Sequence, residues 1–121
     1  MSRKKIHDDS AVMVENAIAA MQDQKAEDIV VLDFRKIKNA LCDYFVICHA
    51  NNKTQVQAIV NTLEFKMRKD ANSHAWSVEG EANAEWILMD YGSVIIHVFE
   101  ESIRRFYQIE NLWGDAEVSR Y

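Results

Sequence analysis

The sequence of 121 residues contains no proline, only three glycines and only two cysteines. Proline and glycine commonly mark linkers between domains, so their scarcity predicts a single domain. No apolar run approaches the roughly 20 residues that a membrane-spanning helix needs. The first nine residues, MSRKKIHDD, lack the apolar segment of a secretory signal. We therefore expect a cytoplasmic protein that does not associate with a membrane.

Cys42 and Cys48 both fall in or beside a predicted strand. Two buried, reduced thiols are the interpretation that the sequence favours, and a disulfide or a metal-binding pair is the alternative. Cys48 is followed by His49, but adjacent side chains on a strand point to opposite faces of the sheet. These two residues therefore do not predict a metal site.

The chain is acidic overall, and its basic residues form few clusters. It carries 14 Lys and Arg residues against 19 Asp and Glu residues, a formal net charge of −5. Basic residues cluster only in the short segment 3–5 and at 66–69. Proteins that hold a phosphate backbone non-specifically need a basic stripe, so DNA is not an expected partner. An acidic domain of this kind more readily meets a basic protein surface.

The apolar periodicity predicts eight elements in the order α-β-β-α-β-β-β-α. We expect helices over 10–22 and 53–69, strands over 28–33, 44–48, 75–78, 86–89 and 94–99, and a last helix that begins at Glu100-Glu101 and runs through SIRRFYQIENLW. This order predicts an α/β (α+β) fold with a mixed sheet flanked by helices. In the connection 34–42, Ile37 and Leu41 are expected to point inward.

The clearest local prediction is a β-hairpin, in which Asp90-Tyr91-Gly92-Ser93 joins two apolar strands. Along the first strand Trp86, Leu88 and Asp90 share one face, and Ile87, Met89 and Tyr91 share the other. The face with Trp86 ends in a charge and is therefore the candidate outer surface, while Tyr91 lies in the turn, so either face is open to it. An exposed Trp-Leu pair rimmed by carboxylates is typical of a protein-binding site. The predicted partner-binding residues are Trp86, Leu88, Asp90, Tyr91, Glu79 and Glu81. The alternative is that Trp86 covers the hydrophobic core.

An enzymatic hypothesis competes with this binding hypothesis. Phosphate-binding glycine loops, CxxC pairs, HExxH and serine-elbow motifs are absent from the sequence. Asp28 and Asp33 bracket one predicted strand and Asp43 begins the next, and strand-end carboxylates are able to hold Mg²⁺. A Mg²⁺-dependent nucleotidyl transferase or hydrolase is the alternative function, and solvated strand ends are the simpler interpretation. A third hypothesis is a homodimeric adaptor that pairs its sheet edges with other strands.

The segment VEGEANAEWILMDYGSVIIHVFEESIRRFYQIENLW at 78–113 resembles the signature of the ribosomal silencing factor family, also known as the Iojap or RsfS family. The earlier DYFVI at 43–47, followed after a polar gap by QVQAIV, is similar to the same family's central strand and helix. CHANNKTQ at 48–55 departs from the small-residue segment usual there. The resemblance divides the chain into an N-terminal arm (1–9), expected to be mobile, one domain (10–113) and a tail (114–121) beyond the common family end.

The resemblance implies a nucleotidyltransferase-like fold without its catalytic motif, and a protein that is neither an enzyme nor dependent on a cofactor or metal. It implies binding to ribosomal protein L-fourteen on the large ribosomal subunit, where the bound protein would block joining of the small subunit and so repress translation. It also implies a possible homodimer. On this basis we expect a steric repressor whose outer hairpin face contacts L-fourteen.

Overall fold

The computed structural model describes the backbone of residues 2–121 and the side chains from residue 9 onward. The elements in chain order are α1 (Ser2–Asp23), β1 (Glu27–Asp33), β2 (Tyr44–Ala50), α2 (Lys53–Asp70), β3 (Ser77–Glu79), β4 (Trp86–Asp90), β5 (Val94–Glu100), α3 (Glu101–Tyr107), the 3₁₀ helix η1 (Ile109–Asn111) and β6 (Glu117–Arg120). The eight predicted elements are confirmed in their predicted order, and η1 and β6 are added.

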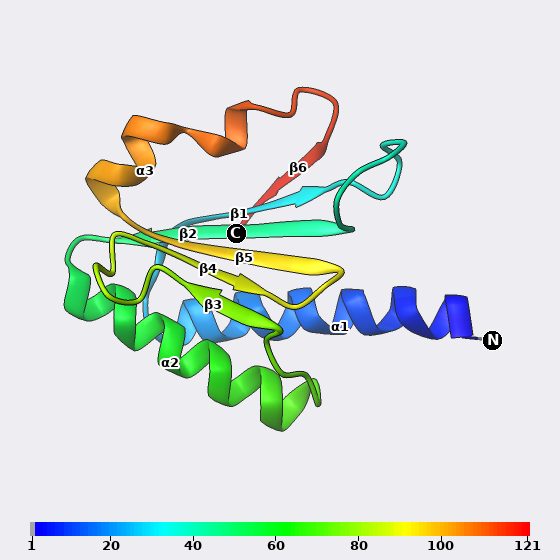
Figure 1. Ribbon diagram of the computed structural model, residues 1–121, viewed down its shortest axis with the longest axis horizontal. Helices are drawn as coiled ribbons and strands as arrows, with labels where there is room; N and C mark the ends of the chain where they lie inside the picture. Colours follow the sequence, from blue (N-terminus) through cyan, green and yellow to red (C-terminus); the bar gives the residue numbers. More distant parts are fainter. Residues whose placement is uncertain (1) are drawn as a thin grey trace.

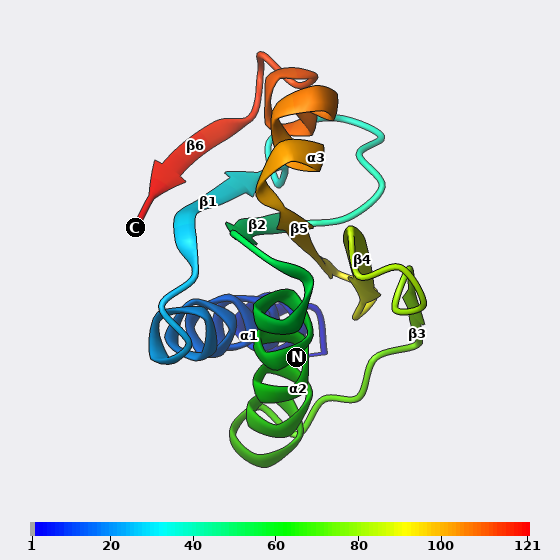
Figure 2. The same ribbon diagram turned by 90° about the vertical axis from the view of Figure 1, so that its left-hand side faces the viewer.

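The six strands form one mixed sheet in the order β3-β4-β5-β2-β1-β6 (Figure 1). β2 and β5 are parallel, whereas every other neighbouring pair is antiparallel. α1 and α2 lie side by side against one face of the sheet, and α3 lies on the opposite face (Figure 2). The predicted mixed sheet with flanking helices is therefore confirmed. We refer to the face opposite α1 and α2 as the outer face.

The main core lies between the sheet and the helix pair α1 and α2. Ile87 and Met89 of β4 point into it and are fully buried, while the alternate residues of the same strand are only half-buried. The helix α2 contributes the predicted apolar face: Val56, Ile59, Val60, Leu63 and Met67. Asn52 caps this helix, because its side chain accepts a hydrogen bond from the Gln55 backbone N–H at 2.8 Å. The alternation of β4 and the helical spacing of α2 therefore both place their apolar residues in the same core.

Two helix ends differ from the sequence prediction. α1 begins at Ser2 rather than near residue 10, while the side chains of residues 1–8 lie outside the described part of the chain. The mobility expected for the arm 1–9 therefore stays a prediction. α3 ends at Tyr107 because Gln108 takes a left-handed backbone conformation with φ of 45°, which ends the helical path and starts η1.

Strand β6 lies within residues 114–121, which the family resemblance sets apart as a tail. Its four residues pair antiparallel with β1 from Val30↔Arg120 to Asp33↔Glu117. All four β6 side chains are exposed, so the segment lacks the apolar alternation that signals a strand. Backbone pairing rather than side-chain burial makes it part of the sheet.

Among the described residues, no helix combines the length and the apolar character needed to cross a bilayer.

Candidate protein-binding face

The outer face carries its side chains in rows that run across the strands, because cross-strand partners share a face. The first row, in strand order from β3 to β1, contains Ser77, Asp90, Ile95, Phe45 and Leu32. The second row contains Glu79, Leu88, His97, Ile47 and Val30. The third row contains Trp86, Phe99 and His49. A second apolar cluster on this face joins residues of β1, β2 and β5 to α3, η1 and Trp113.

The β3–β4 side of the outer face is open, since Leu88, Asp90 and Ile95 keep part of their surface exposed. Trp86 and Glu79 lie on the same face and are half-buried and exposed, respectively. The structure therefore brings together four of the six predicted binding residues: Trp86, Leu88, Asp90 and Glu79.

The structure does not bring Tyr91 and Glu81 to this face. Tyr91 is only 6% exposed and packs into the core on the α2 side of the sheet, as its place in the strand alternation beside Ile87 and Met89 requires. Glu81 accepts a hydrogen bond at 3.1 Å from the Gln57 side chain of α2, which covers the opposite face. The placement of Tyr91 on the outer face is corrected, because its side chain is buried. Glu81 is exposed and directed toward α2, and its role in binding a partner stays a prediction.

Trp86 packs against the second apolar cluster and also keeps part of its surface exposed. Its ring stacks on Phe99 of β5 at 5.0 Å between centroids, and the ring of Tyr107 from α3 lies 5.1 Å away. A hollow of about 290 Å³ lies between Trp86, Leu88 and Glu79, and another of about 180 Å³ lies between Trp86, Ile103 and Tyr107. Trp86 thus covers the second apolar cluster and also presents a partly exposed surface bordered by hollows.

His97 holds the indole of Trp86 in place. The Trp86 Nε1–H donates to His97 Nδ1 at 3.1 Å, so the imidazole proton of the neutral ring lies on Nε2. His97 is 3% exposed, and its Nε2 has no hydrogen-bond partner among the described residues. Burial without a charged partner lowers the pKa of His97 to about 4. The ring is therefore neutral at physiological pH and serves as an acceptor for Trp86.

The lowered pKa of His97 predicts a loss of stability in mild acid. Between pH 6.5 and the folded-state pKa, the unfolded chain binds a proton that the folded chain does not, so stability falls as pH falls. We expect this histidine to cost about 2 kcal/mol between pH 6.5 and pH 5. Urea unfolding of His97→Gln should show a correspondingly shallower pH dependence than the wild type. The exposed-site variant His74→Gln should behave as wild type, and equal slopes for His97→Gln and wild type would contradict the assignment.

A buried arginine joins α3 to the sheet. Arg104 is 3% exposed, and its Nη1 donates to the Asp28 carbonyl at 2.7 Å and lies 2.9 Å from His49 Nδ1. Its Nε donates to Glu110 of η1 at 3.1 Å. Burial, followed by the charge of Arg104, lowers the pKa of His49, which keeps that ring available as an acceptor. This cluster holds α3, and with it Tyr107, over the third row of the outer face.

The three aspartates of the enzymatic hypothesis are not brought together. Asp28 and Asp33 lie toward opposite ends of β1; Asp28 pairs with Arg120 at 2.9 Å and Asp33 with Arg35 at 2.8 Å. The hydrogen bonds from Arg35 hold the pKa of Asp33 below its usual value. Asp43 accepts a hydrogen bond from the Ser10 hydroxyl at 3.3 Å. Within the described part of the chain, no group of three or more His, Cys, Asp or Glu side chains is placed to hold a metal ion.

The cysteines follow the favoured interpretation. Cys42 and Cys48 are both free and buried. Burial raises the pKa of the Cys42 thiol to about 11 and that of the Cys48 thiol to about 12, so both remain protonated. Cys48 points into the main core while the neighbouring His49 lies on the outer face, as strand alternation requires.

The connection 34–43 is the part of the site that sequence reasoning missed. Leu41 was expected to point inward, yet it is 89% exposed, whereas Ile37 is half-buried. Phe34 is buried against Phe45 and Trp113, with ring centroids 4.9 and 5.5 Å away. Residues of this connection therefore pack beside Phe45 on the outer face, while Leu41 projects into solvent. The two apolar residues Phe34 and Ile37, three positions apart, were the sequence feature that could have indicated this packing.

Comparisons with known proteins agree with the resemblance seen in the sequence. Residues 7–120 match the family described as "Ribosomal silencing factor during starvation". A relative from Bacillus subtilis with the name "Ribosomal silencing factor RsfS" is 44% identical over 104 residues, which cover 85% of this chain and 86% of the relative. A protein of the same name from Halalkalibacterium halodurans is 39% identical over 104 residues, covering 86% and 87%. These relatives are named as silencing factors and not as enzymes.

Solved structures show the same arrangement of elements. A crystal structure of a Chromobacterium violaceum protein superposes with a TM-score of 0.78 at 34% sequence identity, covering 84% of this chain and 83% of that one. A crystal structure from Bacillus halodurans gives a TM-score of 0.70 at 38% identity, with 82% and 90% covered.

Proposed function

The chain belongs to the ribosomal silencing factor family, and on that premise we propose that it binds the large ribosomal subunit and represses translation. The proposed contact is ribosomal protein L-fourteen, and the proposed binding surface is the open part of the outer face. Once bound there, the protein would occupy the surface on which the small subunit docks. The mechanism is steric, so no bond is made or broken.

The observation that carries this proposal is the open apolar strip of the outer face with acidic groups beside it. Trp86, Leu88 and Ile95 are partly exposed on a rigid sheet, and Glu79 and Asp90 border them. A pre-ordered aromatic anchor surrounded by polar groups is the usual composition of a protein-binding hot spot. The acidic border suits a basic partner surface, such as that of a protein that also contacts ribosomal RNA.

Co-sedimentation with separated ribosomal subunits tests the binding step. The protein should travel with the large subunit through a sucrose gradient and should not travel with the small subunit. Sedimentation with neither particle would contradict the proposal. We further propose that the protein is cytoplasmic, as its ribosomal partner would require. Sedimentation of the protein alone tests the predicted homodimer.

The acidic border is expected to control the rate of association. The double variant Glu79→Gln/Asp90→Asn removes both charges, and the Asn side chain retains an oxygen for the Gly92 N–H that Asp90 binds at 2.8 Å. We expect association with large subunits to slow several-fold and to depend less on salt, because rim charges act mainly on encounter. Stopped-flow measurements at two salt concentrations give both quantities. Glu81→Gln is the matched control, since Glu81 is directed toward α2; equal kinetics for the double variant and this control would refute the acidic-border role.

A further inference from the structure

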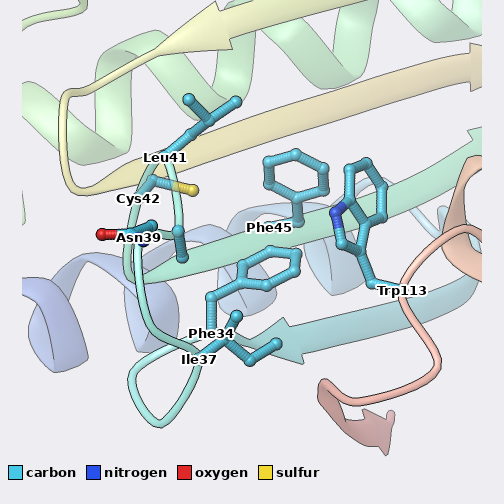
Figure 3. A pocket seen from close by; sticks show the side chains of 8 residues that line it. Phe34, Ile37, Asn39, Leu41, Cys42, Phe45 and Trp113 are labelled. Carbon is cyan, nitrogen blue, oxygen red and sulfur yellow. The ribbon is translucent and has the colours of Figure 1, made fainter.

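An apolar hollow lies between the 34–43 connection and the outer face (Figure 3). Its volume is about 160 Å³, and its lining residues are Phe34, Ile37, Asn39, Ala40, Leu41, Cys42, Phe45 and Trp113. The rings of Phe34, Phe45 and Trp113 gather on one side, and Leu41 stands apart from them on the rim. The hollow is therefore built from two segments that are far apart in the sequence and meet over β2.

The size and chemistry of the hollow suit one apolar side chain. An apolar cavity of about 150 Å³ accommodates a benzene molecule, so a hollow of this volume accepts a leucine, isoleucine or phenylalanine side chain. Among the lining side chains, Asn39, Cys42 and Trp113 carry polar atoms, and the Cys42 thiol donates to the Tyr44 carbonyl at 3.4 Å. Water there has few groups to bind, so its displacement by an apolar side chain is favourable.

The hollow continues the surface proposed to bind the ribosome. Phe45, which forms its floor, is the cross-strand neighbour of Ile95, and Ile95 is the neighbour of Asp90. A partner that covers Leu88 and Ile95 therefore reaches the hollow without leaving the outer face. Leu41 extends the same apolar strip as an exposed side chain on the rim.

The charges around the hollow indicate the chemistry of the segment that enters it. Arg35 is paired with Asp33 at 2.8 Å and Lys36 with Glu117 at 3.0 Å, whereas Lys38 is exposed and makes no ion pair among the described residues. The opposite end of the strip carries the acidic groups of the β3–β4 side. The charges of Asp43 and Asp90 also act on the Cys42 thiol in the hollow, so Lys38 supplies the basic group of an otherwise acidic or charge-paired surface. A partner segment that matches these charges has a basic group facing the β3–β4 side. It also has a carboxylate, facing Lys38, next to the apolar side chain that enters the hollow.

We propose that this hollow receives one leucine-, isoleucine- or phenylalanine-sized side chain of the ribosomal protein that the outer face binds. A carboxylate of the same segment pairs with Lys38. The inference rests on the proposed function and adds to it a second anchor, separated from Trp86 by His97, with a defined size and charge. Two anchors at opposite ends of the strip fix the orientation of the bound protein, and blocking of subunit joining requires a fixed orientation.

Binding of two variants to large subunits tests the second anchor. Leu41→Asp places a charge at the mouth of the hollow, and Ile37→Trp fills it from within. We expect each to weaken binding at least tenfold. Phe65→Asp is the matched control, because Phe65 is an exposed apolar residue on α2, on the opposite side of the sheet; it should bind within twofold of the wild type. Circular dichroism confirms that Leu41→Asp is folded, as its exposure predicts.

The outcomes separate this inference from the function on which it rests. Failure of the wild type to bind large subunits overturns the proposed function, and the inference with it. If the wild type binds and Trp86→Ala weakens binding, but Leu41→Asp and Ile37→Trp bind as the wild type does, the second anchor is wrong and the proposed function stands. Weakened binding by both hollow variants but not by Phe65→Asp supports the second anchor.

Discussion

Replacing Trp86 with alanine is expected to weaken binding to large ribosomal subunits by about 30-fold. Truncation of a central aromatic anchor typically costs about 2 kcal/mol or more, which corresponds to that factor in affinity. Trp86 is well placed for this role because Phe99 and Tyr107 hold its ring and His97 fixes its N–H, so little side-chain entropy is lost on binding. A sedimentation or fluorescence titration with purified large subunits gives the two affinities.

The matched control for Trp86→Ala is Phe65→Ala, which removes an exposed aromatic ring from α2. This variant should keep the wild-type affinity. Because Trp86 also covers the second apolar cluster, Trp86→Ala must be shown to be folded by its far-ultraviolet spectrum and its cooperative unfolding. A folded Trp86→Ala protein with wild-type affinity would remove Trp86 from the binding surface.

Replacing Arg104 with methionine is expected to lower the free energy of unfolding by about 3 kcal/mol. Methionine fills much of the same space but cannot donate to the Asp28 carbonyl, His49 and Glu110. Removing one member of a buried charged pair leaves its partners without compensation, and this is costlier than losing an exposed pair. Urea unfolding at neutral pH measures the effect.

Arg105 provides the comparison from the next position on the same helix. Its guanidinium pairs with Glu101 but remains largely exposed, so Arg105→Met should lower the free energy of unfolding much less than Arg104→Met does. A similar loss for both variants would mean that the buried network around Arg104 adds no more than a surface ion pair. We also expect Arg104→Met to weaken ribosome binding, because α3 carries Tyr107 over Trp86.

The local patterns of the sequence were sufficient for most of the fold. In β4, the period-2 alternation predicted that Ile87 and Met89 point inward and that Trp86 and Leu88 lie on the opposite face. The structure confirms this pattern, because the first pair is fully buried and the second pair is half-buried. The same alternation placed Tyr91 on the inner face, and assigning it to the binding surface set that pattern aside. Strand periodicity was a better guide here than the expectation that a turn residue is free to point either way.

The remaining features that local sequence patterns did not predict depend on contacts between distant segments. β6 is made by backbone pairing with β1, and its exposed side chains give no periodic signal. The direction of Glu81 is set by Gln57, which is 24 residues earlier in the chain. Leu41 is 89% exposed and stands at the rim of a hollow lined by Phe34, Phe45 and Trp113, which come from segments far apart in the chain. The position of each of these residues depends on partners elsewhere in the chain, so the residues around it in the sequence do not predict it.

The outer face connects the stability of the fold to its proposed role. Arg104 anchors α3 and places Tyr107 against Trp86, while Phe34 and Trp113 shape the hollow at the other end of the strip. The open strip between these two ends is formed by residues of β4 and β5, which are held by the main core from behind. The proposed binding surface is thus ordered by the fold itself, which would limit the entropy lost on association.

The central claim is that the protein prevents the two ribosomal subunits from joining by covering the large one. Light scattering of purified subunits, mixed after the large subunit has been incubated with the protein, tests this claim most directly. We predict that the yield of joined ribosomes falls as the protein approaches one copy per large subunit, and that Trp86→Ala is needed at much higher concentration. An unchanged yield at saturating wild-type protein would contradict the steric mechanism.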